Sequence, residues 1–409
     1  MRLHFVSALA LLILMPLAVN ANQAIAIDSL KEAVHAAWSQ QPTVKAALAR
    51  RADFAARTSA TTSMLKGAPA LSLENWSDRL TSRAGLVKYA GEFSLPLWLP
   101  KERGATKATV ATEAAQFEAL LLASHLQTSG LTLDAYWAWH LAEVDATLAQ
   151  NRANELQLLS TDTDRRLRAG FLSRFDAQLV LGQLQVAKVV VLQSKNIASN
   201  FKKELERIVG AEVAASLSDS RGVPSEAVIK AALSSHPMLG LAKAAVELAE
   251  SNLALVQITN RDTPELGVGI FRERGALGSS LESIVTLRLR VPFASDNKNA
   301  SRLSAARAEA EEARATLGLE QLKYSAAIAA AQVDLITAEQ VVLLAAQRRA
   351  LSADNFQLIK KSFSLGEADL PSRLRAQNEF LDAEHALLRA KIEIAKSVSR
   401  LNHAVGLLP

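Results

Sequence analysis

The feature that most constrains the fold of this chain is an internal repeat of about half its length. Pro42 and Pro237, each preceded by a short polar run, lie 195 positions apart. Other landmark pairs keep this register at spacings of 195 or 196: Pro69 with Pro264, Gly170 with Gly366, and Gly210 with Gly406. Such a period is typical of a fold built by duplication of one unit. The two copies span Ser29–Gly210 and Ser225–Gly406.

Each copy predicts the same order of elements, namely a helix, two strands, a very long helix and a shorter helix. In the first repeat, taken as 22–210, we expect a helix at 29–65, strands at about 69–77 and 85–96, and helices at 101–169 and 173–209. In the second repeat, 225–406, we expect a helix at 225–260, strands at about 263–272 and 282–293, and helices at 297–365 and 369–405. Residues 211–224 are expected to form a linker and residues 407–409 a tail.

The expected helix lengths are related to one another. The long helix at 101–169 would extend for about 100 Å, and its two neighbours for about 55 Å each. The two shorter helices placed end to end therefore match the long one. We expect each repeat to form a pair of columns, one continuous and one made of two stacked pieces. Ordinary globular proteins have much shorter helices, about 11 residues on average.

The strand segments alternate between apolar and polar residues. Between Val285 and Val291, and largely so in 87–95, apolar side chains fall on one face of a strand and polar ones on the other. This pattern over about ten residues is typical of outer-membrane strands, although a half-buried sheet of a soluble domain has it too. Aromatic residues at the strand ends favour lipid: Trp76, Trp98, Phe271 and Phe293. The polar residues expected to face a channel lumen are Lys88, Glu92, Arg288 and Arg290. They either tune ion entry or form a solvated lining without selectivity.

The N-terminus has the pattern of an export signal. Arg2 precedes an apolar run at 9–14, and the small residues up to Ala21 indicate a cleavage site. The chain has no Cys, which excludes disulfides, thiolate metal sites and a lipoprotein anchor. No later stretch reaches about 18 uninterrupted apolar residues, so we expect any membrane span to be made of strands. A cleaved signal peptide at 1–21 and export are therefore predicted.

Four strands per chain cannot close a barrel. Closed barrels are the sheets that lipid tolerates, and the smallest need about eight strands. We therefore expect the chain to pool its strands with further copies of itself. This argument alone leaves open whether two, three or four chains take part.

The residues resemble the family of TolC-like outer membrane efflux proteins over essentially the whole mature chain. Besides the repeat and the strand hairpins, the first turn between long helices, Ala169–Asp176, has the family's pattern of Gly followed six residues later by Asp. The resemblance implies a mainly helical, tandem-repeat TolC-like fold, with a long α-helical barrel and a homotrimeric 12-stranded transmembrane β-barrel. It also implies a cell outer membrane location with the helices in the periplasm, and as partners a periplasmic adaptor (membrane fusion) protein, an inner-membrane efflux pump and outer membrane lipid.

Within the family, short segments at the ends of the strands are most similar to the heavy-metal cation efflux (CzcC-like) branch. These segments are Leu97–Arg103, Gly269–Gly275 and Pro292–Asn299. The resemblance implies a passive exit duct for heavy-metal cations that an inner-membrane proton-coupled pump drives. The alternative within the same architecture is a duct for drugs or for type I secretion of a polypeptide. An alternative of another class is a soluble periplasmic coiled-coil scaffold.

The two turns between long helices are the best candidate functional residues. A Gly at each turn allows the helical hairpin to reverse, which by itself explains its presence. The resemblance adds docking of the adaptor at the periplasmic tip, by Gly170, Phe171, Leu172, Ser173, Asp176, Gly366, Glu367 and Asp369. The second turn departs from the family pattern, because the residue six positions after its Gly is Ser. The gate candidates are therefore Asp176, Glu367, Asp369, Ser372 and Arg375.

No enzyme or cofactor site is predicted. The histidines show no spacing of metal ligands and no HExxH motif: His35, His125, His140, His236, His385 and His403. The pair Asp382 and His385 on one helix face is read as a solvated contact. The net charge of +5 over 409 residues gives no nucleic-acid footprint.

Overall fold

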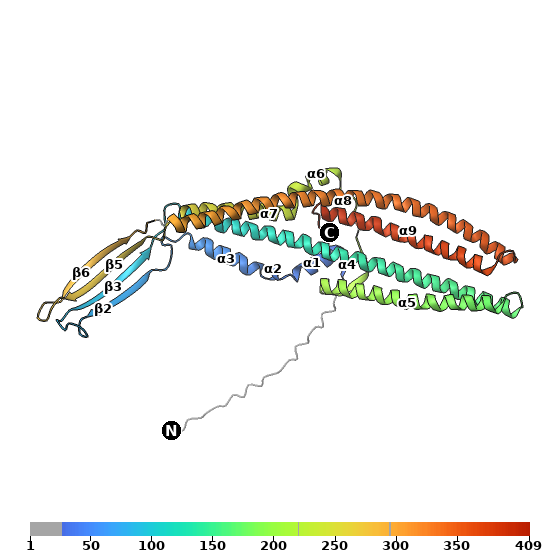
Figure 1. Cartoon of the computed structure of the whole chain (residues 1–409), viewed down its shortest axis with the longest axis horizontal. Helices are drawn as coiled ribbons and strands as arrows, with labels where there is room; N and C mark the ends of the chain where they lie inside the picture. Colours follow the sequence, from blue (N-terminus) through green and yellow to red (C-terminus); the bar gives the residue numbers. More distant parts are fainter. Residues whose placement is uncertain (1–26, 220, 294–295) are drawn as a thin grey trace, which may run out of the picture.

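The structure is a computed structural model that describes residues 27–219, 221–293 and 296–409. The predicted signal peptide, 1–21, lies outside the described residues, as does part of the segment 292–299. The protein is an elongated rod, with a β-sheet at one end and two helical turns at the other (Figure 1). It is mainly helical with a small β part, as predicted.

Four helices make up the half of the molecule away from the sheet: α4 (Glu102–Arg168), α5 (Arg174–Val209), α8 (Asp296–Leu365) and α9 (Leu370–Ala404). At 67 and 70 residues, α4 and α8 each extend for about 100 Å. In this half α4 packs against α5 and α8 packs against α9, as two hairpins (Figure 1). Toward the sheet, α7 (Pro237–Ile258) packs against both α4 and α8.

The first helix of each repeat is broken, contrary to the prediction of one continuous helix. Residues 29–65 form α1 (Leu30–Ser39), α2 (Pro42–Lys45) and α3 (Ala47–Ala60). Residues 225–260 form α6 (Glu226–Ser235) and α7. The residue before each helix-starting proline, Gln41 or His236, has an extended backbone. A proline disfavours a helical conformation in the residue before it and lacks an N–H to donate, which explains both breaks.

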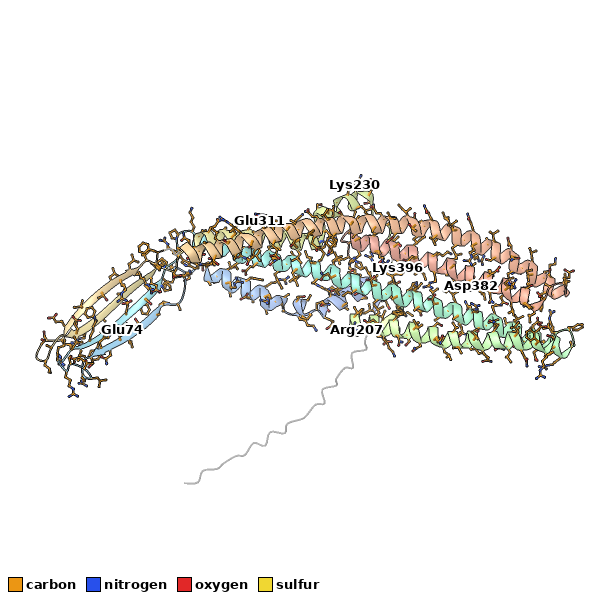
Figure 2. All side chains as sticks on the ribbon, in the orientation of Figure 1. Glu74, Arg207, Lys230, Glu311, Asp382 and Lys396 are labelled. Atoms are coloured by element: carbon orange, nitrogen blue, oxygen red, sulfur yellow. The ribbon has the colours of Figure 1, made fainter. Side chains whose placement is uncertain are left out.

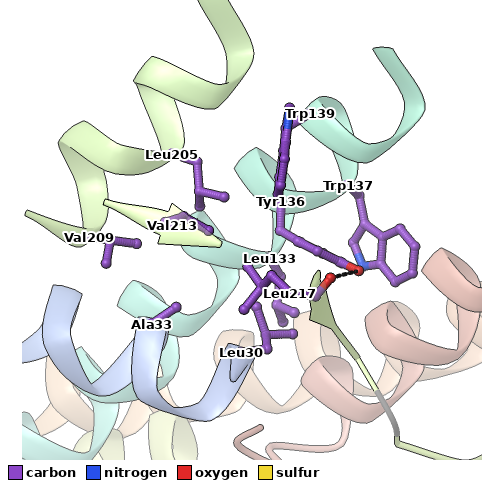
Figure 3. Packing of buried hydrophobic residues seen from close by; sticks show 10 residues of the cluster. All are labelled: Leu30, Ala33, Leu133, Tyr136, Trp137, Trp139, Leu205, Val209, Val213 and Leu217. Atoms are coloured by element: carbon purple, nitrogen blue, oxygen red, sulfur yellow. Dashed lines mark hydrogen bonds between the residues drawn. The ribbon is translucent and has the colours of Figure 1, made fainter. Parts of the chain in front are cut away.

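The predicted linker at 211–224 also contains a strand. β4 (Val213–Ser218) pairs in parallel with β1 (Ile27–Ser29) in a sheet of two strands. Around it Leu30, Leu133, Leu205 and Val209 pack into a buried core, in which the hydroxyl of Tyr136 donates to the carbonyl of Leu217 at 3.3 Å (Figure 3). Both strands are short and lie far apart in the sequence, so neither has a readable pattern of its own.

The larger sheet has four antiparallel strands in the order β2-β3-β5-β6. Its strands are β2 (Ala70–Ser77), β3 (Val87–Pro96), β5 (Glu265–Arg274) and β6 (Glu282–Arg290). The two hairpins join through β3 and β5, which pair over their full length from Val87 opposite Arg274 to Pro96 opposite Glu265. Each repeat thus supplies one hairpin, and β2 and β6 are the two edges.

The register separates the side chains of this sheet by polarity. One side, the apolar face, exposes between 45% and 77% of each of these residues: Leu71, Leu73, Tyr89, Phe93, Val268, Ile270, Val285, Leu287 and Leu289. The other side, the polar face, carries Glu74, Lys88, Glu92, Glu265, Glu273, Glu282, Arg288 and Arg290. Figure 2 labels Glu74 on β2. A sheet in water would cover its apolar face, so this one needs lipid or another chain against it.

Two of the aromatic residues expected to anchor the strand ends in lipid lie on the polar face instead. Trp76 and Phe271 approach Lys88, whose ammonium lies 6.0 Å and 4.1 Å from the two ring centroids. These two rings therefore make cation–π contacts with the Lys88 ammonium. Trp98 donates its indole N–H to the carbonyl of Ser63, and Phe293 is 91% exposed.

Two helices expose long apolar surfaces. α5 and residues Asn299–Leu365 of α8 each contain an 18-residue window apolar enough to cross a membrane by length and composition, with 22% of each window buried. α8 is more than three times as long as the roughly 30 Å core of a bilayer. Both helices lie along the rod beside other helices of the same chain rather than alone. We therefore interpret their exposed apolar surfaces as surfaces that pack laterally against another chain. They include Leu181, Val186, Leu192, Leu319, Leu322, Val333, Leu343 and Leu351.

Candidate functional site

The first turn between long helices lies at the end of the rod away from the sheet. Gly170 has φ +77°, a left-handed conformation in which a side chain is strained. The N–H of Gly170 donates to Leu167 and that of Phe171 to Arg166, so the last carbonyls of α4 are satisfied. This arrangement is a Schellman motif, which a glycine supports at this position.

The second turn has the same geometry. Gly366 has φ +83°, and the N–H of Glu367 donates to the carbonyl of Ser362 at 2.9 Å. Nothing lies within 4 Å of a Cβ built on Gly170 or Gly366, so the positive φ alone accounts for the glycines. Both repeats therefore end their long helix with the same glycine-dependent backbone turn.

The two turns begin their outgoing helices with exchanged cap residues. In the first, the hydroxyl of Ser173 accepts from the N–H of Asp176 at 3.1 Å and donates to the Asp176 carboxylate at 2.6 Å. In the second, the carboxylate of Asp369 accepts from the N–H of Ser372 at 3.0 Å. The departure from the family pattern at Ser372 is thus an exchange of Ser and Asp between the two capping positions.

In both turns an acidic gate candidate, Asp176 or Asp369, takes part in the hydrogen bonds that cap the outgoing helix. Hydrogen bonds from Ser372, from its hydroxyl first, lower the pKa of Asp369, and the charge of Arg375 adds to this shift. A carboxylate at either capping position also meets the positive end of the helix dipole. Glu367 and Arg375 are exposed. The remaining predicted residue of this end, Leu172, packs beside the buried cluster near the turns.

Large apolar side chains are exposed beside the first turn. Phe171 is 82% and Phe175 is 72% exposed. A groove of about 420 Å³ opens behind them between α4 and α5, lined by Gln157, Ser160, Thr161, Thr163, Asp164, Leu167, Arg174, Ala177, Gln178 and Leu181. Exposed aromatic rings next to a groove are common where a partner protein binds.

A cluster that joins the two hairpins lies one to two helical turns behind the turns, and we call it the tip clasp. The buried ring of Phe363, on α8, is approached by the guanidinium groups of Arg166 at 4.8 Å and Arg373 at 4.7 Å. The carboxylate of Asp162 lies 3.2 Å from Arg166 and 3.5 Å from Arg373. Burial lowers the pKa of Arg373, and Asp162 opposes this shift. The clasp comprises α4, α8 and α9, so it joins the first repeat to the second.

Sequence reasoning did not find the tip clasp. Its members lie up to about 200 residues apart, and only the crossing of α4 and α9 brings them together. Farther from the turns, Arg152 on α4 pairs with Asp382 on α9 at 3.4 Å, and Asp145 contacts His385 at 2.7 Å. Figure 2 labels Asp382 on α9. His385 therefore contacts a carboxylate of the other repeat rather than Asp382.

The sheet pairs its charges across strands. Arg288 on β6 lies 3.1 Å from Glu92 on β3, although β5 runs between these strands. Gly267 of β5 makes the contact possible, because a Cβ there would lie 2.7 Å from the Glu92 carboxylate. Farther along, Arg290 lies 3.9 Å from Glu265, and Lys88 lies 3.9 Å from Glu273. All four predicted lumen residues thus lie on the polar face in ion pairs.

Among the described residues, no group of three or more His, Asp or Glu is arranged to hold a metal ion. His236 is 1% exposed, and its ring lies 4.2 Å from that of Tyr324. Burial first, and the charge of His403 second, lower the pKa of His236. His236 therefore belongs to the packing within the second repeat, whereas His403 also contacts the carbonyl of Leu126 of the first repeat at 3.0 Å.

The sequence and the fold were compared with those of known proteins. Residues 228–407 match the sequence model of a family described as "Outer membrane efflux protein". Solved structures similar to this one include VceC from Vibrio cholerae, with a TM-score of 0.72 at 16% identity over 92% of this chain and 96% of that one. Another is the CmeC outer membrane channel from Campylobacter jejuni, with a TM-score of 0.70 at 16% identity over 92% and 85% of the two chains.

This chain has the fold of the outer-membrane channels. The TolC-like fold class that the family resemblance implied is therefore confirmed, and the second repeat matches the efflux protein family. That family and that fold are non-enzymatic. The structure of CusC is also similar, with a TM-score of 0.73 at 15% identity over 92% of each chain.

A curated relative also matches in sequence. Protein CyaE from Bordetella pertussis is 24% identical over 271 residues, which are 62% of this chain and 56% of that protein. The alignment thus spans little more than half the length of CyaE.

Proposed function

We propose that this chain is one subunit of a homotrimeric exit duct that crosses the periplasm and the outer membrane. The observation that carries the proposal is the sheet, which has one exposed apolar face, one charged face and two open edges. With lipid on the apolar face and water on the polar face, both faces are in their preferred solvent. Joining β2 of one copy to β6 of the next satisfies both edges.

The exposed helix surfaces support assembly as well. α5 and α8 each contain an 18-residue apolar window of which 22% is buried, and further copies of the same chain would cover the exposed part. A ring of three chains would have 12 strands, which is within the range of known outer-membrane barrels. The family resemblance implies three chains. Pairing of the two edge strands requires only that the sheet closes into a barrel and does not set the number of chains.

The assembly can be tested by disulfide formation, because the chain has no native Cys. A cysteine is placed at Ser72 on β2, and a second is scanned along β6 from Ser283 to Leu289. Oxidation in outer membranes is expected to give a ladder that ends at the mass of three chains at one register. Single-cysteine variants are the matched controls. Monomers that need no detergent, and give no such ladder, would contradict the duct and favour a soluble scaffold.

We further propose heavy-metal cations as cargo, moved by an inner-membrane proton-coupled pump. The polar face supports a cation, because its five glutamates outnumber its three basic residues, Lys88, Arg288 and Arg290. An excess of negative charge along a narrow path concentrates cations there. Its charges are mostly paired, so no single site would hold the ion tightly, as passage requires.

The cargo is tested by metal sensitivity of a deletion strain, ion by ion, with rescue by the wild-type gene. Rescue for one or more divalent metals is expected. Loss of drug tolerance or of polypeptide secretion, with unchanged metal tolerance, would replace metal by that other cargo. In bilayers, the double variant Arg288→Glu/Arg290→Glu is expected to increase the preference for cations. An unchanged reversal potential would mean that the polar face is a solvated lining without selectivity.

The two turns are proposed as the periplasmic tip, where an adaptor docks and the duct closes. Phe171, Phe175 and the groove behind them support docking at the first turn. Glu367 and Arg375 are charged groups at the second turn that are available for a gate, in addition to the capping residues Asp176, Asp369 and Ser372. Replacement of Gly170 and Gly366 by Leu is expected to block efflux while the subunits still assemble. Normal efflux in that variant would refute the docking role.

A further inference from the structure

We propose that the apolar face of the sheet carries a binding site for the phosphate groups of the outer-leaflet glycolipid, lipid A, centred on Arg272 with Arg274. The inference rests on the proposed function, because it requires this face to contact lipid. It adds a specific lipid contact to what would otherwise be a uniform hydrophobic surface.

The apolar face is not apolar along its full height. From the helix end outward, three cross-strand rows carry mainly aliphatic side chains, and the third contains Leu73, Ile270 and Val285. The next row contains Arg272, paired in register with Tyr89 and Ser283. Rows on one face are about 7 Å apart along a strand. The change from aliphatic to basic thus occurs within one step, as at the edge of a hydrocarbon layer.

Arg272 is exposed, and among the described residues no carboxylate lies within ion-pair distance of it. Arg274, on the same face one row farther, donates its Nε–H to the carbonyl of Gly85 at 3.2 Å, which fixes its guanidinium near the loop. Arg79 and Arg83, in the loop between β2 and β3, are exposed at this same end of the sheet. The outer end of the apolar face and its adjoining loop are therefore basic.

The acidic residues near this end of the sheet do not neutralise these arginines. Glu74, Glu273 and Glu282 lie on the polar face by register. Asp78, in the loop, is 8% exposed, and its carboxylate accepts from the hydroxyl of Ser82 and the N–H of Gly85. At this level the strand carboxylates thus lie on the face opposite Arg272 and Arg274, where Glu273 pairs with Lys88.

A lone arginine in lipid is costly at the bilayer midplane and nearly neutral at the interface. The position of Arg272 therefore sets the level of the headgroups on this barrel. A guanidinium binds phosphate through two parallel N–H···O bonds, which favours a phosphorylated lipid over a neutral one. Tyr89, 54% exposed beside Arg272, is the kind of amphipathic ring that lies at a membrane interface. Lipid A supplies phosphate at this level of the outer leaflet.

The test uses the full-length purified protein in nanodiscs of phosphatidylcholine, with bis-phosphorylated or dephosphorylated lipid A as the added probe. Native mass spectrometry counts bound probe for the wild type, for Arg272→Gln/Arg274→Gln and for Arg288→Gln/Arg290→Gln. The last is a matched control, because it removes the same charge from the polar face of the same sheet. We expect the wild type to prefer the phosphorylated probe, the double variant to bind it about tenfold more weakly, and the control to match the wild type.

Equal binding of both probes by the wild type, or an equal loss in the control, would overturn the site. If the wild type inserts and conducts yet shows no preference for phosphate, the lipid site fails and the duct stands. If the wild type does not insert into any bilayer, both proposals fail. A folding defect in the double variant is detected by comparing its melting temperature and its conductance with those of the wild type.

Discussion

The two repeats form the same turn between their long helices, but they cap the outgoing helix with different residues. Both reverse direction at a glycine with positive φ, yet the first caps its outgoing helix with Ser173 and the second with Asp369. The partner position is exchanged in the same way, with Asp176 in one and Ser372 in the other. Duplication therefore preserved the geometry of the cap rather than the identity of its residues.

The repeats also differ at their helix breaks. The first repeat places Gln41 before its helix-starting proline, and the second places His236, which is buried and caps α7 with its ring nitrogen. The first repeat builds its mid-rod core around Tyr136 and two short strands, whereas the second uses α6 against α8. Equivalent positions thus acquired different packing where the two halves meet different neighbours.

The sheet allows the sharpest comparison, because both repeats supply one hairpin to one apolar face. Leu73 of the first and Val285 of the second lie in the same row, 77% and 76% exposed. We expect Leu73→Arg or Val285→Arg to cost about 2–4 kcal/mol per chain and to block insertion equally. Membrane fractionation and bilayer conductance measure this. Ser72→Arg, on the polar face, is the control, and equal loss in that variant would contradict the assignment of faces.

The tip clasp tests whether the repeats depend on one another. Arg373→Ala leaves Asp162 without a charge partner from the second repeat and removes one of the two guanidinium groups that pack against Phe363. We therefore expect a loss of about 1–3 kcal/mol and a looser tip. Chemical denaturation and channel conductance measure the two effects. Asp164→Ala is the control, because it removes an exposed i,i+4 pair with Arg168 within α4, for which about 0.5 kcal/mol or less is expected. Equal effects of both variants would mean that the clasp does not couple the hairpins.

The exchanged caps predict smaller, matched effects. Ser173→Ala and Asp369→Ala should each destabilise the start of the outgoing helix by about 1 kcal/mol. Hydrogen exchange of the first turn of α5 and of α9 reports each helix separately. The double variant Asp369→Ser/Ser372→Asp gives the second turn the residues of the first, and we expect nearly wild-type protection. Strong deprotection in that variant would mean that the exchange reflects some other constraint.

The smallest expected effect concerns His236. Its pKa is lowered in the folded protein, so the unfolded chain takes up its proton at higher pH. The resulting contribution to stability is complete above about pH 6.5 and is lost as the pH falls toward the lowered pKa. Gln41 occupies the equivalent position in the first repeat. The variant His236→Gln should therefore show a smaller drop in melting temperature between pH 7 and pH 5 than the wild type. His403, which faces His236, is replaced separately as a control. An unchanged drop would assign the acid sensitivity to other groups.

Much of this architecture could be predicted from the sequence because it depends on local pattern. The period of two in the strands places Leu73 and Ser72 on opposite faces in any antiparallel sheet. The glycines at 170 and 366 interrupt long helical runs, so the hairpins follow from backbone chemistry. The helix breaks at Pro42 and Pro237 were equally local, and the same steric rule would have predicted them.

Other features required the tertiary structure. The partners of Arg373, the cross-strand reach of Arg288 over Gly267, and the pairing of β1 with β4 join segments far apart in the chain. No periodicity encodes which of two distant helices will cross. The rings of Trp76 and Phe271 illustrate this limit, because their position at strand ends indicated lipid and the register placed them beside Lys88.

By itself, then, the sequence determined a duplicated unit, its rods and turns, and a strand pattern with one apolar and one charged side. Those properties follow from side-chain chemistry within a few residues along the chain. The tertiary structure decided which charges meet, how the two hairpins are joined near the tip, and at what height the apolar face becomes basic. These depend on contacts between distant segments, whose energies are set by the packed arrangement rather than by neighbours in sequence.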